Sequence, residues 1–262
     1  MSRLKSLFPL ACALAGLWSA GMGPAHALAS GDLMFAGFNA DADRFAMIAM
    51  TDIGPYSSLY FTDNEWNGQA IGAGGAFNSG ESYQRWETGA AVLSAGTVIT
   101  FKVGTPGTLS ASVGSFGDVG VPGNTGYGLS QTAETIYAYV GNAALNPTGF
   151  IGALSSGGFS DRDGTIKGTG LVLGESAIEL AFGSDFAEYN GPRGDVASVA
   201  SYRQRIGNRA NWVDGGDGSY GSQAIDTRYF PLLLTPTPEP AGLVLALAGG
   251  ALLSWRRRAS RG

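Results

Sequence analysis

The sequence predicts an all-β fold: a single β-sandwich-like domain with one short helix near residues 195–207, flanked by a helix at each end of the chain. Apolar residues fall into short runs of strand length, and residues that favour turns separate these runs. Glycine supplies 42 and proline 11 of the 262 residues without a collagen-like period, while 11% of the residues are aromatic. Many short strands joined by glycine-rich turns are typical of sandwiches and barrels.

Seven segments have the pattern of strands. In chain order they are 32–38, 44–50, 58–62, 96–103, 135–140, 150–154 and 176–182. The glycine-rich segments 68–80 and 113–128 are predicted to be long loops, because strand-like sequence resumes after each. No repeat of 20 to 50 residues occurs, which disfavours a solenoid or a propeller.

The one helical segment of the domain lies near residues 195–207. Asp195 is a suitable N-cap, and Gly207 with Asn208 provides a stop signal. Between them apolar residues recur at helical spacing, at Val196, Val199, Tyr202 and Ile206. Four arginines of this stretch predict either a solvated helix face or a local patch for an anionic polymer; they are Arg193, Arg203, Arg205 and Arg209.

Residues 1–27 have the three parts of a secretory signal peptide. Two basic residues open the chain, an apolar run follows, and Ala25 and Ala27 form a small-residue cleavage site. We expect signal peptidase to cut after Ala27, or after Ala29 at a second such site. The alternative is a buried N-terminal helix, which the charged start and the glycines after the run disfavour.

Removal of this segment changes the chemistry available to the protein. Cys12 and His26 are the only cysteine and histidine, so the exported chain has neither, which excludes disulfides, Cys/His zinc sites and Ser-His-Asp triads. Of the 21 acidic and 16 basic residues, one acidic and six basic residues lie in the two end segments, which leaves 20 and ten in the domain. Such a surface repels phosphate backbones, so nucleic acid is not an expected partner.

The C-terminal residues 236–262 predict a short transmembrane helix. An apolar run over residues 241–255 is preceded by Pro238, Glu239 and Pro240 and is followed at once by a membrane stop of Arg256, Arg257 and Arg258. Basic residues stay on the cytoplasmic side, so the domain of residues 28–235 is expected outside. A permanent tail anchor or a buried helix is the alternative.

This arrangement resembles the PEP-CTERM sorting signal of bacterial surface proteins, which combines a Pro-Glu-Pro motif, a short transmembrane stretch and a basic tail at the extreme C-terminus. The resemblance implies an exosortase-type transpeptidase as a partner. That enzyme would recognise Pro238 to Pro240 and remove the tail. The protein would then pass from a transient inner-membrane anchor to the cell surface or the extracellular space.

The domain itself has a second resemblance. Segments 31–50, 59–68 and 188–195, with Asn211 and Trp212, resemble an uncharacterised extracellular domain family of secreted bacterial proteins. The resemblance implies one domain over about residues 30–230, in agreement with the domain of residues 28–235 that lies between the two end segments. It implies no catalytic residues.

Alternating oxygen donors at Asn39, Asp41 and Asp43 resemble the first ligands of a calcium loop. An EF-hand is excluded, because Arg44 replaces the required glycine and Met50 replaces the bidentate glutamate. A weaker calcium site remains, and Asp63, Asp161 or Asp163 are further candidate ligands. The alternative is a hairpin turn whose polar side chains bond to nearby backbone groups.

Asp63, Glu65 and Trp66 form a second candidate ligand site at the end of a predicted strand. The two carboxylates could bind a sugar that stacks on the indole, or act as acid and base in glycoside hydrolysis. A turn beside a core tryptophan is the structural alternative.

These observations together predict an exported cell-surface or extracellular-matrix protein with a structural or adhesive role in a biofilm or exopolysaccharide layer. It is not expected to be an enzyme, and calcium is the one candidate cofactor. The alternatives are a carbohydrate-binding module, with extracellular polysaccharide as the partner, and a carboxylate- or metal-dependent hydrolase.

Overall fold

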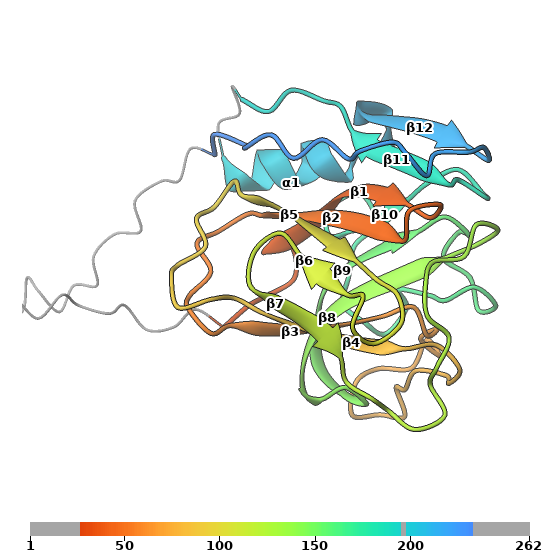
Figure 1. The fold of residues 1–262 in the computed structure, drawn as a ribbon. Coiled ribbons are helices and arrows are strands. Elements are labelled where there is room, and N and C mark those ends of the chain that lie inside the picture. The colour runs from red at the N-terminus through yellow and green to blue at the C-terminus, as the bar shows by residue number, and fades with distance from the viewer. Residues whose placement is uncertain (1–26, 195–197, 233–262) are drawn as a thin grey trace, which may run out of the picture.

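The computed structural model describes residues 27–194 and 198–232, and in this part of the chain two six-stranded sheets face each other (Figure 1). The first sheet has the strand order β12-β11-β1-β2-β5-β6, and the second has the order β10-β9-β8-β3-β4-β7. The predicted all-β, sandwich-like domain is therefore confirmed. The predicted terminal helices lie outside the described residues.

The first sheet is built from β1 (Leu33–Asn39), β2 (Arg44–Ala49), β5 (Val98–Lys102), β6 (Ser110–Ala111), β11 (Phe186–Tyr189) and β12 (Trp212–Gly216). The second is built from β3 (Ser58–Thr62), β4 (Tyr83–Glu87), β7 (Ser115–Asp118), β8 (Thr135–Ala143), β9 (Asn146–Ser155) and β10 (Ala177–Glu179). The pairing of β9 with β10 is parallel, and every other pairing between named strands is antiparallel.

All seven predicted strands are present, but five strands had no sequence prediction: β4, β6, β7, β11 and β12. The prediction of a loop over residues 113–128 is wrong where β7 forms. β4 and β7 are rich in polar residues, yet Gln84 and Trp86 of β4 are buried and Phe116 of β7 packs beside them. Gln84 and Trp86 are two residues apart, so they lie on the same face of the strand, and that face is buried. A hydrophobicity pattern does not identify such a strand, because one of its buried residues is polar.

Helix α1 (Val199–Gly207) begins later than predicted. Its N-cap is Ser198, whose hydroxyl accepts a hydrogen bond from the Ser201 amide, so the predicted N-cap Asp195 lies upstream of the helix and outside the described residues. The C-terminal stop is confirmed, because Asn208 is the C-cap. The apolar stripe is confirmed by Tyr202 and Ile206, which are buried against the first sheet.

The core between the sheets is aromatic. Phe45 of β2 stacks on Phe101 of β5 with ring centroids 4.9 Å apart, and Phe61 of β3 contacts both rings from the opposite sheet at 5.2 and 4.9 Å. Trp86 meets Phe101 edge to face. Aromatic contacts of this kind add about 0.5 to 1.5 kcal/mol beyond area burial, and they hold together a domain that has no disulfide.

The outer face of the second sheet is covered by loops. Trp66 packs edge to face on Phe77 and Phe150 at 5.1 and 4.9 Å. Beneath them lie Tyr137 and Tyr139 of β8, so the predicted loop 68–80 forms the lid of a second aromatic cluster. Both faces of the sheet are therefore buried where this cluster lies, whereas Arg85 and Glu87 of β4 stay partly exposed.

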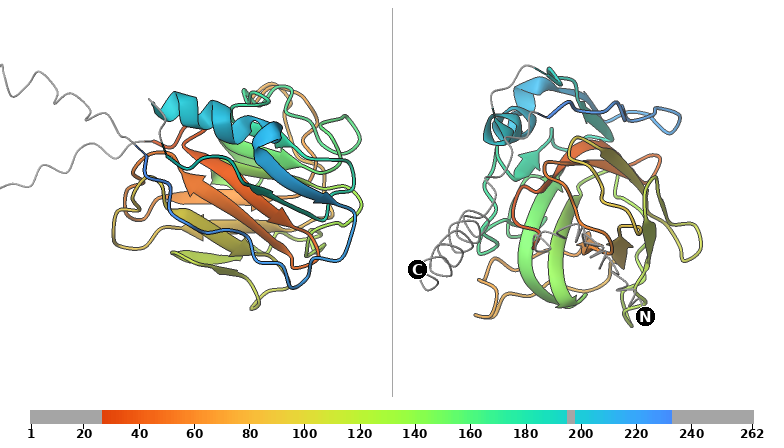
Figure 2. Two further views of the ribbon diagram at one scale, coloured as in Figure 1. Left: turned by 90° about the horizontal axis from the view of Figure 1, so that it is seen from above. Right: turned by 90° about the vertical axis from the view of Figure 1, so that its left-hand side faces the viewer.

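The outer face of the first sheet is covered by α1 and by residues 220–232, which we call the strap (Figure 2). Asn39 fixes the start of the strap, since its side-chain amide donates to the carbonyls of Tyr220 and Gln223, each at 2.9 Å. Phe230 fixes the end, because its amide donates to the Gly96 carbonyl at 2.9 Å.

Helix α1 holds both ends of the described domain. The hydroxyl of Tyr202 donates to the Pro231 carbonyl at 3.2 Å, and the adjacent Arg203 pairs with Asp32 at 2.9 Å. The chain therefore enters and leaves at one end of the sandwich. We call this the chain-end face; it comprises residues 27–32, 50–57, 88–97 and 229–232.

Three of the four predicted arginines form ion pairs within the domain. Arg193 pairs with Asp226 at 2.9 Å and lies over the ring of Phe230, Arg203 pairs with Asp32, and Arg209 pairs with Asp214 at 3.3 Å. These pairs tie the segment before the helix to the strap, the helix to Asp32, and the segment after the helix to β12.

The packing of the strap against β1 can be tested at Gly37. A Cβ there would lie 2.3 Å from Cγ2 of Ile225, whereas a Cβ at Gly117 of β7 meets nothing within 4 Å. We expect Gly37→Ala to lower the free energy of unfolding by about 1 to 3 kcal/mol, as overpacking does. Gly117→Ala is the control and should have little effect. Ile225→Ala should recover part of the loss in denaturant unfolding; equal effects of the two glycine variants would contradict this packing.

Candidate functional site

Carboxylates gather at the end of the sandwich opposite the chain-end face, which we call the acidic end. The β1–β2 turn brings Asp41 and Asp43 there, and the residues after β3 bring Asp63 and Glu65. Glu81 precedes β4 and Glu134 precedes β8, so both reach the same end. Segments far apart in the sequence thus place their acidic residues together.

The β1–β2 turn uses its polar atoms to bind other segments. Asn39 accepts a hydrogen bond from the Ala42 amide at 3.0 Å, and Asp43, at φ 51°, accepts one from the Leu129 amide at 2.9 Å. Asp41 accepts from the amide of Tyr220 and, at 2.6 Å, from the side chain of Gln131. This geometry is that of the structural alternative, a polar turn.

Within residues 27–194 and 198–232, no three His, Cys, Asp or Glu side chains are grouped so that they could hold a metal ion. The calcium site at Asn39, Asp41 and Asp43 stays a prediction.

The turn also lines a hollow of about 650 Å³. Asp41, Asp43 and Arg44 form one side, Lys102 and Thr100 of β5 form another, and strap residues 221–225 and Thr227 complete it. Carboxylates, cations and amides therefore face one space. Such a lining offers donors and acceptors to a polar ligand.

Asp63 and Glu134 are both nine-tenths buried or more. One carboxylate oxygen of Asp63 has no hydrogen-bond partner among the described residues, whereas Glu134 accepts from the amides of Ser130 and Thr135 at 2.7 and 2.8 Å. Neither acid has a basic side chain in an ion pair in this part of the chain.

Burial therefore controls how these acids titrate. Burial, reinforced by the charges of Glu134 and Glu81, holds the pKa of Asp63 well above its usual range. Burial likewise raises the pKa of Glu134 to about 8, although its two amide hydrogen bonds oppose the shift. Glu81 lies nearer the surface, and burial with the charge of Glu65 raises its pKa as well.

The candidate ligand set Asp63, Glu65 and Trp66 is divided by the fold. Glu65 is half-buried at the rim and accepts a hydrogen bond from the Asn78 side chain. Trp66 is only 1% exposed, and its indole N–H donates to the Gln69 carbonyl at 3.0 Å. The indole has no exposed face on which a sugar could stack.

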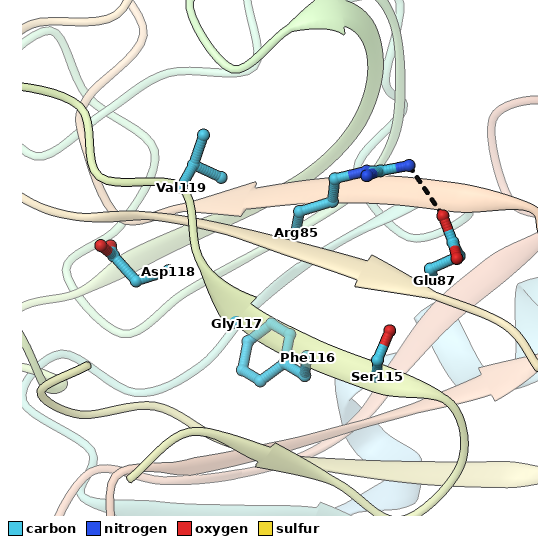
Figure 3. Close-up of a pocket in the computed structure, with 7 residues that line it drawn as sticks. All are labelled: Arg85, Glu87, Ser115, Phe116, Gly117, Asp118 and Val119. Atoms are coloured by element: carbon cyan, nitrogen blue, oxygen red, sulfur yellow. Dashed lines mark hydrogen bonds and ion pairs between the residues drawn. The ribbon is translucent and has the colours of Figure 1, made fainter. Parts of the chain in front are cut away.

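A second, shallower hollow of about 430 Å³ follows edge strand β7 (Figure 3). In Figure 3 the guanidinium of Arg85 points toward Glu87, to which it is bonded at 2.8 Å, and away from Asp118. The Asp118 carboxylate has one buried oxygen without a partner among the described residues. The hollow is open and lacks an arrangement of catalytic groups.

We compared the chain with protein-family models, with curated proteins and with solved structures to find relatives whose function is known. None of the three gives a match. In the described ranges, no helix has the length and apolar character to cross a membrane. The sorting motif, the membrane stop and the cleavage residue Ala25 lie outside those ranges.

Sequence reasoning missed Glu81, Glu134 and Lys102 as members of the acidic end. Each lies at the end of a strand or just outside one, in a segment with no motif around it. The directions of the paired strands could have identified these residues, because they determine which strand ends lie at the same end of the sandwich. Once β3 and β8 are paired antiparallel, the residue before β8 lies at the same end of the sheet as the residues that follow β3.

The buried acids predict a pH dependence of stability. A carboxyl whose pKa is higher in the folded than in the unfolded chain binds its proton more tightly in the fold. The stability that this proton adds is present at acid pH and is lost as the pH rises through the folded-state pKa. The contribution of Glu134 to the free energy of unfolding decreases as the pH rises from about 4.5 to about 8. Asp226 titrates below this range, since Arg228 lowers its pKa.

We therefore expect the melting temperature to fall as the pH is raised from about 5 to about 8. Glu134→Gln should reduce that slope, whereas Glu175→Gln, at an exposed turn, should retain it. Thermal unfolding followed by circular dichroism at a series of pH values makes the measurement. A flat profile for the unmodified chain would show that these acids are ionised in the fold.

Proposed function

We propose that this protein is an exported cell-surface or extracellular-matrix protein, sorted through its C-terminal segment, with a structural or adhesive role. The strap carries the proposal. It packs against the core of the domain as far as Leu232, and only residues 233–237 separate it from Pro238. The Pro-Glu-Pro motif thus follows the folded domain directly and precedes the apolar run, where a processing enzyme at the membrane would need it.

The separation of the two ends supports an adhesive role. The acidic end is opposite the chain-end face, so a chain held by its C-terminus would present its acidic loops and the 650 Å³ hollow outward. An extracellular polysaccharide is the partner that fits these polar groups. Nucleic acid fits poorly, because the domain has twice as many acidic as basic residues.

A carbohydrate-binding module is the second candidate, and the hollow beside the β1–β2 turn favours it. We expect Lys102→Ala to weaken retention on an exopolysaccharide column, because it removes a donor from the lining. Lys167→Ala, which lies outside this lining, is the control. Hydrolysis is less favoured, since Asp63 is buried and lacks a second carboxylate across an open cleft.

The sorting proposal predicts the fate of a motif variant. Replacing Pro238, Glu239 and Pro240 with alanine should leave membrane insertion intact and block release, so that the uncut form accumulates in the membrane fraction. Proline fixes φ and keeps the preceding residue extended, which leaves the motif accessible above the membrane. Alanine replacement of Thr235, Pro236 and Thr237 is the control. Wild-type protein at the outer surface that still contains Arg256 to Arg258 would contradict the proposal.

A further inference from the structure

The chain-end face exposes two tyrosines and a valine on adjoining loops. Tyr56 is 66% exposed, and Val92 and Tyr229 are each 56% exposed. The amide of Tyr56 donates to Gly89 at 3.1 Å, at the start of the loop that holds Val92. The hydroxyl of Tyr229 donates to the carbonyl of Ala95 at 2.8 Å, near the end of that loop. These contacts hold the three side chains on one connected surface.

Tyr56 has a backbone conformation that its side chain disfavours. Its φ is 57°, in the left-handed region, and the described residues contain only one other non-glycine with positive φ, Asp43. Asp43 is explained by its bond to Leu129, whereas the Tyr56 ring is mostly exposed and fills no core position. Strain retained at an exposed aromatic residue points to a role outside packing.

The sequence limits how far this face can lie from a membrane. The strap ends on the chain-end face at Leu232, and the apolar run begins at residue 241. The eight residues between them span at most about 29 Å when fully extended. Three of them are prolines, which shorten this reach toward about 3.1 Å per residue.

The chain-end face contains two charged residues, and both of them have partners. Asp32 pairs with Arg203 at 2.9 Å, and Asp52 accepts a hydrogen bond from the Ala95 amide at 2.9 Å. Arg228 borders this face, just before Tyr229; it is 75% exposed, and its partner Asp226 also pairs with Arg193. Two arginines thus share one carboxylate close to Tyr229 in the chain.

We propose that the chain-end face rests on the lipid bilayer while the protein is anchored, with Tyr56, Val92 and Tyr229 at the headgroup level. This inference rests on the proposed function, since it requires the C-terminal run to span the membrane. Tyrosine suits this location because its ring is apolar and its hydroxyl is polar. The contact fixes the orientation of the domain, so that the acidic end faces away from the membrane.

The test uses the membrane-inserted chain with its tail. Cys12→Ser leaves no cysteine, and a single cysteine at Val92→Cys or, as control, at Phe182→Cys receives a fluorophore. Phe182 is 65% exposed and lies at the acidic end, where Gly183 bonds to Ser156 and Ser156 to Glu134. The probe is a vesicle of phosphatidylcholine and phosphatidylglycerol with brominated lipid tails, which quench a fluorophore at the bilayer surface.

We expect brominated lipid to reduce the emission of the label at position 92 and to leave the label at position 182 unchanged. Adding Tyr56→Ser and Tyr229→Ser should abolish the quenching at position 92. Equal quenching at both positions, or none at either in a chain that floats with the vesicles, overturns this inference alone. Self-quenching at position 92 that disappears on dilution would assign the face to a second copy and also overturn it. A chain that does not float with vesicles overturns the proposed anchoring as well.

Discussion

The arrangement of the two ends of the sandwich depends on the contacts that helix α1 makes with the first and the last residues of the domain. Tyr202 binds the end of the strap through Pro231, and Arg203 binds the start of the domain through Asp32. Because neighbouring residues of one helix make these contacts, the chain must enter and leave at the same end of the sandwich. The opposite end is then free to collect the loops that bear carboxylates.

Coverage of both sheets explains how a domain without cysteine is held together. The inner faces share the aromatic core around Phe45, Phe61 and Phe101. Loops around Trp66 bury the outer face of the second sheet, while α1 and the strap bury that of the first. In the described ranges, the hollow beside Asp41 lies at one end of the sandwich and the hollow beside Arg85 lies at an edge.

Strands with a continuous run of apolar residues can be predicted from the sequence. Strands in which buried residues alternate with polar or charged residues cannot. β2 is recognised from its apolar run, but β4 contains Gln84 and Arg85 and becomes evident only when it pairs with β3. Trp66 resembles a ligand residue in the sequence because the aromatic cluster that buries it comes from distant strands. Glu134 has no motif, and its burial beside Asp63 follows from strand pairing alone.

Hydrogen exchange in the Tyr202→Phe variant tests the role of α1 most directly. The variant keeps the buried ring and removes the hydroxyl that binds Pro231. We expect faster exchange of the Phe230 amide, which bonds to Gly96 at the end of the strap, with unchanged exchange of Ile136 in β8. Unchanged exchange at Phe230, or an equal increase at both amides, would contradict it.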